Sequence, residues 1–163
     1  MKKTIVYIFL ITITLLLYSN IASAQRGNRY GRYNPASNTV YLEFFGSSGN
    51  IYNIGFDKLI KIKANNKLAF GAGVEYLHAM TAEHLDILSF SPQASYLYGN
   101  IHHFEIGVAV VIDVINTELK VPFRIGYRYQ QDEGGFFLRA SINPMVANGY
   151  FSPYGGIAIG WSL

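Results

Sequence analysis

The chain has 163 residues, a length typical of one domain, and 50% of them are hydrophobic whereas 14% are charged. It contains no cysteine, which excludes disulfides, thiolate metal sites and a cysteine nucleophile. The formal charge is +3, but Lys2 and Lys3 lie in a segment that we expect to be removed. This leaves 11 basic against 10 acidic residues, and so small an excess of positive charge does not indicate a nucleic-acid-binding protein.

The first 24 residues have the three parts of a secretory signal peptide. Two lysines form a positive start, residues 5–17 form an apolar core broken only by threonines, and residues 22–24 (Ala-Ser-Ala) form a small-residue cleavage site. We predict cleavage before Gln25, with an uncleaved membrane anchor as the alternative. Residues 25–37 are polar and arginine-rich, and we expect them to form a flexible periplasmic lead-in.

Residues 38–163 form segments of strand length in which apolar and other residues alternate with period two. Turn-forming residues separate these segments, for example at 99–100 and 132–135. The predicted strands are 39–45, 51–59, 67–77, 87–97, 103–112, 120–130, 135–144 and 154–163. Eight sequential antiparallel strands predict an up-and-down β-barrel.

The two faces of the predicted strands differ in composition. One face carries large aromatic and aliphatic side chains and no charge, whereas the other is mainly Gly, Ala and Ser with a few acids and arginines. A transmembrane barrel turns the bulky face towards lipid, whereas a soluble lipocalin-like barrel turns it inward. The polar face, as assigned here, has no Lys or Thr of the kind that water-facing surfaces carry, and its small residues suit a narrow interior. We therefore predict an all-β, eight-stranded transmembrane barrel and keep a soluble periplasmic binding barrel as the alternative.

The connection lengths indicate the direction of the predicted barrel. With a periplasmic amino terminus, the turns at 99–100 and 132–135 are periplasmic, as is a longer connection at 60–66. The longest connections, 78–86 and 146–153, are then external. This direction places outward aromatic side chains in two girdles at the membrane interfaces. The predicted interfacial residues are Phe44, Tyr52 and Tyr76 at the outer rim and Tyr96, Phe104, Tyr127, Tyr129, Phe136 and Trp161 at the periplasmic rim.

Over residues 38–163 the chain resembles the small outer-membrane β-barrel proteins of the OmpA/OmpX-like class. The resemblance rests on the export signal, the eight alternating strands, the terminal strand 156–163, and residues 125–129 followed by 133–135, which look like a hairpin common in such proteins. It implies a porin-like membrane protein of the Gram-negative outer membrane, in contact with outer-membrane lipids and lipopolysaccharide and inserted by the barrel-insertion machinery. The implied assembly signal is Ile157, Ile159, Trp161 and Leu163, where members of the class usually end in Phe.

Seven charged residues on the polar face form the main candidate site. They are Glu43, Asp57, Glu75, Glu105, Arg124, Arg128 and Arg139. Side chains fill the interior of an eight-stranded barrel, and a buried charge without a partner is strongly destabilising. We therefore expect the acids and arginines to pair and plug the lumen of a structural or surface-interaction protein. A small pore or transport barrel for ions or small solutes, in which the pairs exchange partners, is the alternative.

Catalytic, cofactor and metal sites are not expected. The histidines fall at opposite ends of the predicted barrel, with one pair in an external loop and one in a periplasmic turn, and match no zinc spacing; they are His78, His84, His102 and His103. A lesser hypothesis is a divalent-cation site in one external loop, with the ligands His78, Glu83, His84 and Asp86. A hydrolase at the outer rim, using Ser47 or Ser48, is a further alternative, although no nucleophile motif surrounds these serines.

Overall fold

The structure is a computed structural model, and it describes residues 37–46, 51–78, 86–147 and 150–163. The predicted signal peptide and all but the last residue of the predicted lead-in lie outside these ranges, as do Ser47, Ser48, Glu83 and His84. None of the described segments forms a helix that could span a bilayer.

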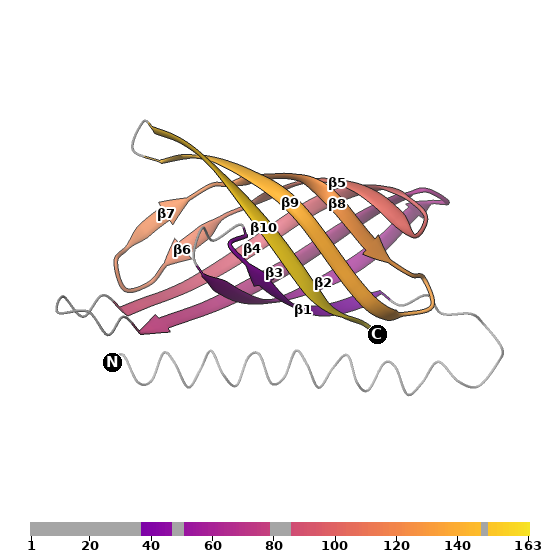
Figure 1. The fold of residues 1–163 in the computed structure, drawn as a ribbon, viewed down its shortest axis with the longest axis horizontal. Coiled ribbons are helices and arrows are strands. Elements are labelled where there is room, and N and C mark those ends of the chain that lie inside the picture. Colours follow the sequence, from indigo (N-terminus) through magenta and orange to yellow (C-terminus); the bar gives the residue numbers. More distant parts are fainter. Residues whose placement is uncertain (1–36, 47–50, 79–85, 148–149) are drawn as a thin grey trace. The chain divides into compact units, whose positions relative to one another are not determined.

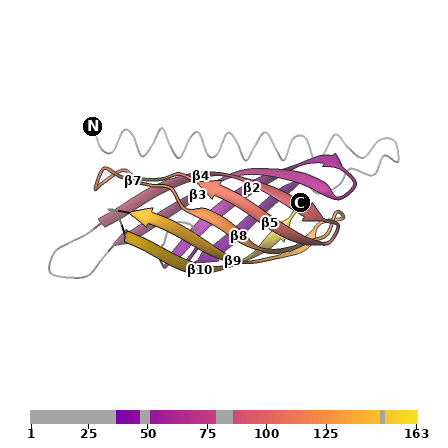
Figure 2. The same ribbon diagram turned by 90° about the horizontal axis from the view of Figure 1, so that it is seen from above.

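Ten antiparallel strands make up the described part of the chain. Their bounds are β1 (Asn38–Phe44), β2 (Tyr52–Lys63), β3 (Asn66–His78), β4 (Asp86–Gly99), β5 (His102–Ala109), β6 (Val111–Asp113), β7 (Glu118–Lys120), β8 (Phe123–Gln130), β9 (Gly135–Ala147) and β10 (Tyr150–Ser162). The paired order is β3-β2-β1-β10-β9-β8-β5-β4, and a further β3–β4 pairing closes the ring. Eight strands therefore form a closed wall and run obliquely around it (Figures 1 and 2).

The two ends of this barrel differ in their connections. The end that carries the β2–β3, β4–β5 and β8–β9 turns and the carboxyl terminus is called the turn end below. The opposite end, called the loop end, carries the β1–β2, β3–β4 and β9–β10 connections and the short β6–β7 hairpin, which pairs with β4.

Two predicted strands are interrupted in the structure. The segment predicted as 103–112 is divided at Val110 into β5 and β6, and the segment predicted as 120–130 is divided at 121–122 into β7 and β8. Pro122 supplies the physical reason for the second interruption, because proline has no N–H to donate to a ladder.

Two predicted connections were wrong because the strands run on. β9 reaches Ala147 and β10 starts at Tyr150, so the external loop predicted at 146–153 is mostly strand. Pro153 lay within the predicted loop and Pro144 ended the predicted strand 135–144, but the two face each other within the β9–β10 ladder. The predicted 60–66 connection is likewise a tight hairpin, in which β2 and β3 pair as far as Lys63 and Asn66.

The strands alternate between a buried inner face and an exposed outer face. Outer side chains are large and apolar; Ile106, Phe123 and Ile142 are 49%, 59% and 61% exposed. The inner face holds the acids and arginines predicted for it, so the inverted arrangement predicted for a lipocalin-like barrel is not the one found. The expectation that the polar face lacks Lys and Thr was wrong, because Lys67 and Thr39 are buried inside.

Candidate functional site

The centre of the barrel is filled by acidic and arginine side chains from five strands. The acids come from β1, β2 and β5, whereas the arginines come from β8 and β9. Each lies at an inward position of its strand and is at most 3% exposed. These residues, called the charge cluster below, are Glu43, Asp57, Glu105, Arg124, Arg128 and Arg139.

Asp57 binds two arginines through one carboxylate oxygen and two neutral donors through the other. Arg128 Nη1 lies 2.8 Å from Asp57 Oδ2, and Arg139 Nη1 lies 3.4 Å from the same oxygen. Tyr41 Oη and Gln93 Nε2 donate to Asp57 Oδ1 at 3.2 and 2.9 Å. Both oxygens of this buried carboxylate are therefore satisfied, as the low polarity of an interior requires.

Glu43 and Glu105 link the three arginines to one another. Glu43 Oε1 accepts from Arg139 Nη2 at 3.0 Å and from Arg124 Nη2 at 3.2 Å. The Glu105 carboxylate lies 3.5 Å from Arg124, 3.7 Å from Arg139 and 3.9 Å from Arg128. Three acids and three arginines thus form one connected and formally neutral group, and no cluster residue depends on a single partner.

Neutral polar side chains extend the cluster towards the barrel wall, and the sequence analysis did not single them out. Gln93 Oε1 accepts from Arg124 Nη1 at 2.7 Å, and its amide nitrogen contacts Tyr41 Oη. Arg128 Nε donates to Gln130 Oε1 at 2.8 Å, and Gln130 Nε2 donates to Thr39 Oγ1 at 3.0 Å. Their inward position in the period-two pattern was the available signal, but an uncharged side chain at such a position does not by itself indicate a partner.

Two aromatic rings pack against the arginines inside the barrel. Arg139 Cζ lies 4.5 Å from the ring centre of Tyr41, and Arg128 Cζ lies 4.8 Å from that of Phe137. The two rings are 5.4 Å apart. Cation–π contacts of this kind are favourable for desolvated guanidinium groups. The rings therefore cover guanidinium surface that the carboxylates leave free and help to fill the lumen.

A second ionic group closes the turn end, and the sequence analysis missed it. Asp132 lies in the β8–β9 turn and reaches Lys67 on β3, with 2.5 Å between Oδ1 and Nζ. Lys67 is buried and also donates to the backbone oxygen of Asn100 in the β4–β5 turn, at 3.0 Å. Lys61 Nζ lies 3.4 Å from Asp132 Oδ2. One carboxylate therefore ties together turns that are distant in the sequence.

The Asp132 pair gives the stability of the barrel a predictable pH dependence. Burial alone would raise the pKa of Asp132, but the hydrogen bond and charge of Lys67, with those of Lys61, outweigh it and lower the pKa. A carboxyl with a lowered folded-state pKa stabilises the fold above its unfolded pKa, and this contribution is lost as the pH falls through the folded value. We expect Asp132→Asn to lower the free energy of unfolding at neutral pH by about 1 kcal/mol.

The measurement is urea unfolding of wild type and Asp132→Asn over a series of pH values. The difference between them is expected to disappear once the pH falls well below about 4, the ordinary pKa of Asp. Glu133→Gln is the matched control, because Glu133 is the neighbouring acid in the same turn and is exposed. A difference that stays constant at low pH would contradict this role of Asp132.

The remaining predicted residues take other places in the barrel. Glu75 is buried, at 2% exposure, on β3 opposite Ser89. His102 and His103 were placed in a turn, which was wrong: both belong to β5, where His102 is exposed and His103 is buried. His78 is the last residue of β3 and pairs in register with Asp86. Among the described residues, no group of three or more histidines and acids has the arrangement to hold a metal ion.

The predicted interfacial and terminal side chains lie on the outer face. Tyr52 and Tyr129 are partly covered, and the others are exposed: Phe44, Tyr76, Tyr96, Phe104, Tyr127, Phe136, Ile157, Ile159, Trp161 and Leu163. At the turn end, the ring of His102 contacts those of Tyr127 and Tyr129, with ring centres 5.9 and 5.5 Å apart. The terminal strand closes the wall against β1, and Leu163 N donates to Asn38 O at 2.7 Å.

No family model and no curated protein sequence matches the chain. The fold is similar to the crystal structure of the N-terminal β-barrel domain of Pseudomonas aeruginosa OprF, with a TM-score of 0.50 and 15% sequence identity. The match covers 80% of this chain and 98% of that domain. At this identity the likeness concerns the fold alone, and it confirms the predicted eight-stranded antiparallel barrel of the OmpA-like type.

Proposed function

We propose that this chain, an eight-stranded barrel with the fold of the OprF N-terminal domain, is an integral protein of the bacterial outer membrane with a structural or surface-interaction role. The observation that carries the proposal is the inversion of its faces. Charged side chains are paired inside, and large apolar side chains are exposed around the outside. A water-soluble protein rarely exposes such a continuous apolar surface, whereas a membrane barrel requires one.

The charge cluster supports a structural role for the centre of the barrel. It joins five strands by ion pairs and occupies the lumen with buried side chains. The ion pairs of the cluster hold these strands together. No nucleophile with an adjacent base is part of the cluster, so it has no arrangement for catalysis. The outward partners we propose are outer-membrane lipids and lipopolysaccharide, and interactions with other surface molecules would take place at the loop end.

A small pore is the second candidate function, and the connectivity of the cluster is the observation that favours it. Arg139 lies within ion-pair distance of three carboxylates, so it can exchange acceptors without losing all of them. Single-channel recording on the purified, folded protein in a planar bilayer tests this role. Steady conductance would favour the pore, whereas a silent bilayer that contains folded protein favours the plugged barrel.

The test of the proposed function is cell fractionation followed by electrophoresis of unheated and heated samples. We expect the mature chain in the outer-membrane fraction, with a band that shifts on heating because folded membrane barrels resist detergent until they are heated. Recovery as a soluble periplasmic protein without a heat shift would overturn the proposal. Mass spectrometry of the same band gives its amino-terminal residue and tests the predicted cleavage before Gln25.

Assembly is expected to depend on Trp161, which we propose belongs to a terminal signal read by the barrel-insertion machinery. Trp161 lies on the outer face of β10, opposite Val40 of β1, and is 58% exposed. We expect Trp161→Asp to remove most of the heat-shifting protein from the outer-membrane fraction, because a carboxylate replaces an interfacial aromatic ring. Trp161→Phe is the control and should assemble. Normal insertion of Trp161→Asp would count against this role of the terminal strand.

A further inference from the structure

The barrel wall has a seam between β8 and β9 in the half nearer the loop end. The two strands pair from Gln130 and Phe137 as far as Ile125 and Ile142. β9 continues to Ala147, and the chain on the other side continues through β8 to β7, but the pairings among the described strands do not join them there. Figure 1 shows the end of the β9–β10 hairpin extending beyond β6 and β7.

Proline explains where the ladder stops. Continuing the register places Phe123 opposite Pro144. Pro144 also faces Pro153 on β10, and two prolines cannot exchange hydrogen bonds, so the backbone of Pro144 is directed at β8. Pro144 has no N–H to donate at that point. The sequence therefore interrupts the ladder within the wall rather than at a free edge, where proline is normally found.

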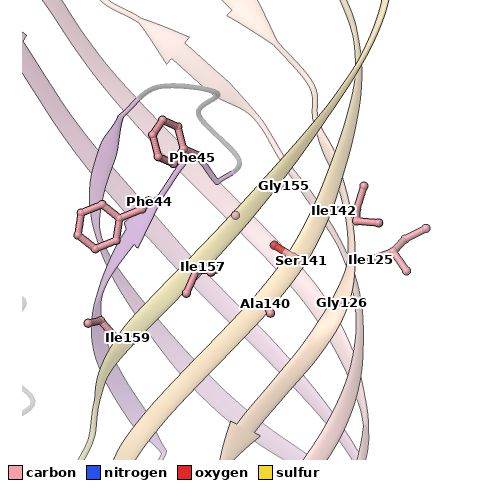
Figure 3. Close-up of a pocket in the computed structure, with 11 residues that line it drawn as sticks. Phe44, Phe45, Ile125, Gly126, Ala140, Ser141, Ile142, Gly155, Ile157 and Ile159 are labelled. Atoms are coloured by element: carbon pink, nitrogen blue, oxygen red, sulfur yellow. The ribbon is translucent and has the colours of Figure 1, made fainter.

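An apolar hollow of about 870 Å³ lies on the outer wall. It reaches the end of this seam that is nearer the turn end of the barrel. Its lining includes Phe44, Ile125, Ala140, Ile142, Gly155 and Ile157. In Figure 3, Gly155 and Ala140 lie between Ile157 on one side and Ile125 and Ile142 on the other. A methyl group added at Gly155 would meet only Ser141 O, at 3.9 Å. The hollow therefore exists because two adjacent outward positions carry small side chains.

We propose that this hollow, together with the β8–β9 seam, is a binding site for one acyl chain of a membrane lipid. The proposal rests on the proposed membrane location. The lining contains no charged side chain, and the hollow is open towards the outside of the barrel. The apolar surface continues from the hollow along the seam towards the loop end, through the exposed side chains of Phe123, Val121 and Leu119. A flexible hydrocarbon chain matches a curved, uncharged site of this kind.

A second copy of the barrel fits the site less well than a lipid. A two-fold symmetric contact brings the same patch of both copies together, so the patch must be complementary to itself. A hollow placed opposite its own copy leaves a void, and voids forfeit packing energy. The lumen is also closed behind the seam, because Arg124, Asn143 and Met145 are at most 4% exposed. The site is therefore open to the outside of the barrel and not to the lumen.

The experiment measures lipid retained by the full chain after extraction from vesicles of phospholipids with sixteen- and eighteen-carbon acyl chains. Native mass spectrometry in mild detergent counts lipid adducts on wild type, Ala140→Leu and Ala94→Leu. Ala94 is the matched control, because it is an outward alanine on β4, paired with Phe70 and Val108, away from the hollow. Wild type and Ala94→Leu should retain one lipid. Ala140→Leu should retain about tenfold less, because its side chain displaces about two methylene groups.

Two further variants test the two parts of the site separately. Gly155→Leu should reduce retention as Ala140→Leu does, since space for its side chain is available. Pro144→Val restores an N–H that can pair with β8 and close the seam. This variant should show slow amide exchange at residues 143–145 and should retain less lipid than wild type. Equal retention in all variants, or dimers in place of lipid adducts, would overturn the proposal. A heat-shifting band that retains no lipid rejects this site alone, whereas absence of the band rejects the membrane location itself.

Discussion

Arg139→Met is expected to lower the free energy of unfolding by about 3–5 kcal/mol, because it leaves three buried carboxylates with two guanidinium groups, so that one buried negative charge is uncompensated. Arg139 lies 3.0 Å from Glu43, 3.4 Å from Asp57 and 3.7 Å from Glu105, so all three acids of the charge cluster lose a partner. The methionine fills much of the volume, so the loss reports charge rather than a cavity. This size of effect equals a large part of the stability of an ordinary domain.

Urea titration in lipid vesicles measures this change, with Trp161 as the reporter, because the chain has a single tryptophan. Adding Glu43→Gln to Arg139→Met removes one acid as well as one arginine, and it should recover more than half of the loss. Lys58→Met is the control, because Lys58 is an exposed cation on the outer face, and it should change stability by less than about 0.5 kcal/mol. A single Arg139→Met variant as stable as wild type would show that the cluster contributes no cohesion.

Val108→Arg is expected to destabilise the barrel in lipid by about 2–4 kcal/mol, the cost of an arginine near the midplane of a membrane barrel. Val108 is 39% exposed on the outer face of β5, four residues from Phe104 at the turn end. With the usual strand rise and tilt, this places Val108 about 10 Å into an apolar band about 25 Å tall. If the outer face were in water instead, the same substitution would be nearly neutral.

Depth is the control for this second prediction. Tyr98 pairs in register with Phe104, is 57% exposed and lies at the turn end of the same wall. Tyr98→Arg should therefore cost at most about 1 kcal/mol, the value for an interfacial position. The pair is measured by unfolding in lipid vesicles. Equal costs at the two positions would contradict a membrane-spanning wall.

The period-two pattern predicted the wall and the charge cluster because both depend on local alternation. Once the strands were aligned by their turns, Asp57 and Arg128 fell on the same face although 71 positions separate them, and the structure joins them at 2.8 Å. Charge gave the second cue, since buried ions need partners. Alternation and charge together predicted the ion pairs at the centre of the barrel, but not the neutral side chains that extend them.

Alternation did not predict features that depend on the turns or on strand register. Lys67 occupies an inward position at the start of β3, but its partner Asp132 belongs to a turn and has no face that a period can assign. Nothing in the sequence indicated that Pro144 and Pro153 lie opposite each other, which only the register of β9 and β10 shows. The hollow at Gly155 and Ala140 likewise needs two strands side by side, because neither small residue is unusual in its own segment.

The placement of the arginines has a consequence for the order in which the barrel forms. Arg128 and Arg139 face each other directly across the β8–β9 hairpin. Like charges at such a pair destabilise the hairpin while it is alone. Glu105 comes from β5, the strand beside β8, whereas Glu43 and Asp57 come from β1 and β2 at the other edge of the sheet, so the repulsion is fully relieved only when the two edges meet. The β8–β9 hairpin therefore gains its full stability only when the ring closes, so closure and the completion of the charge cluster coincide.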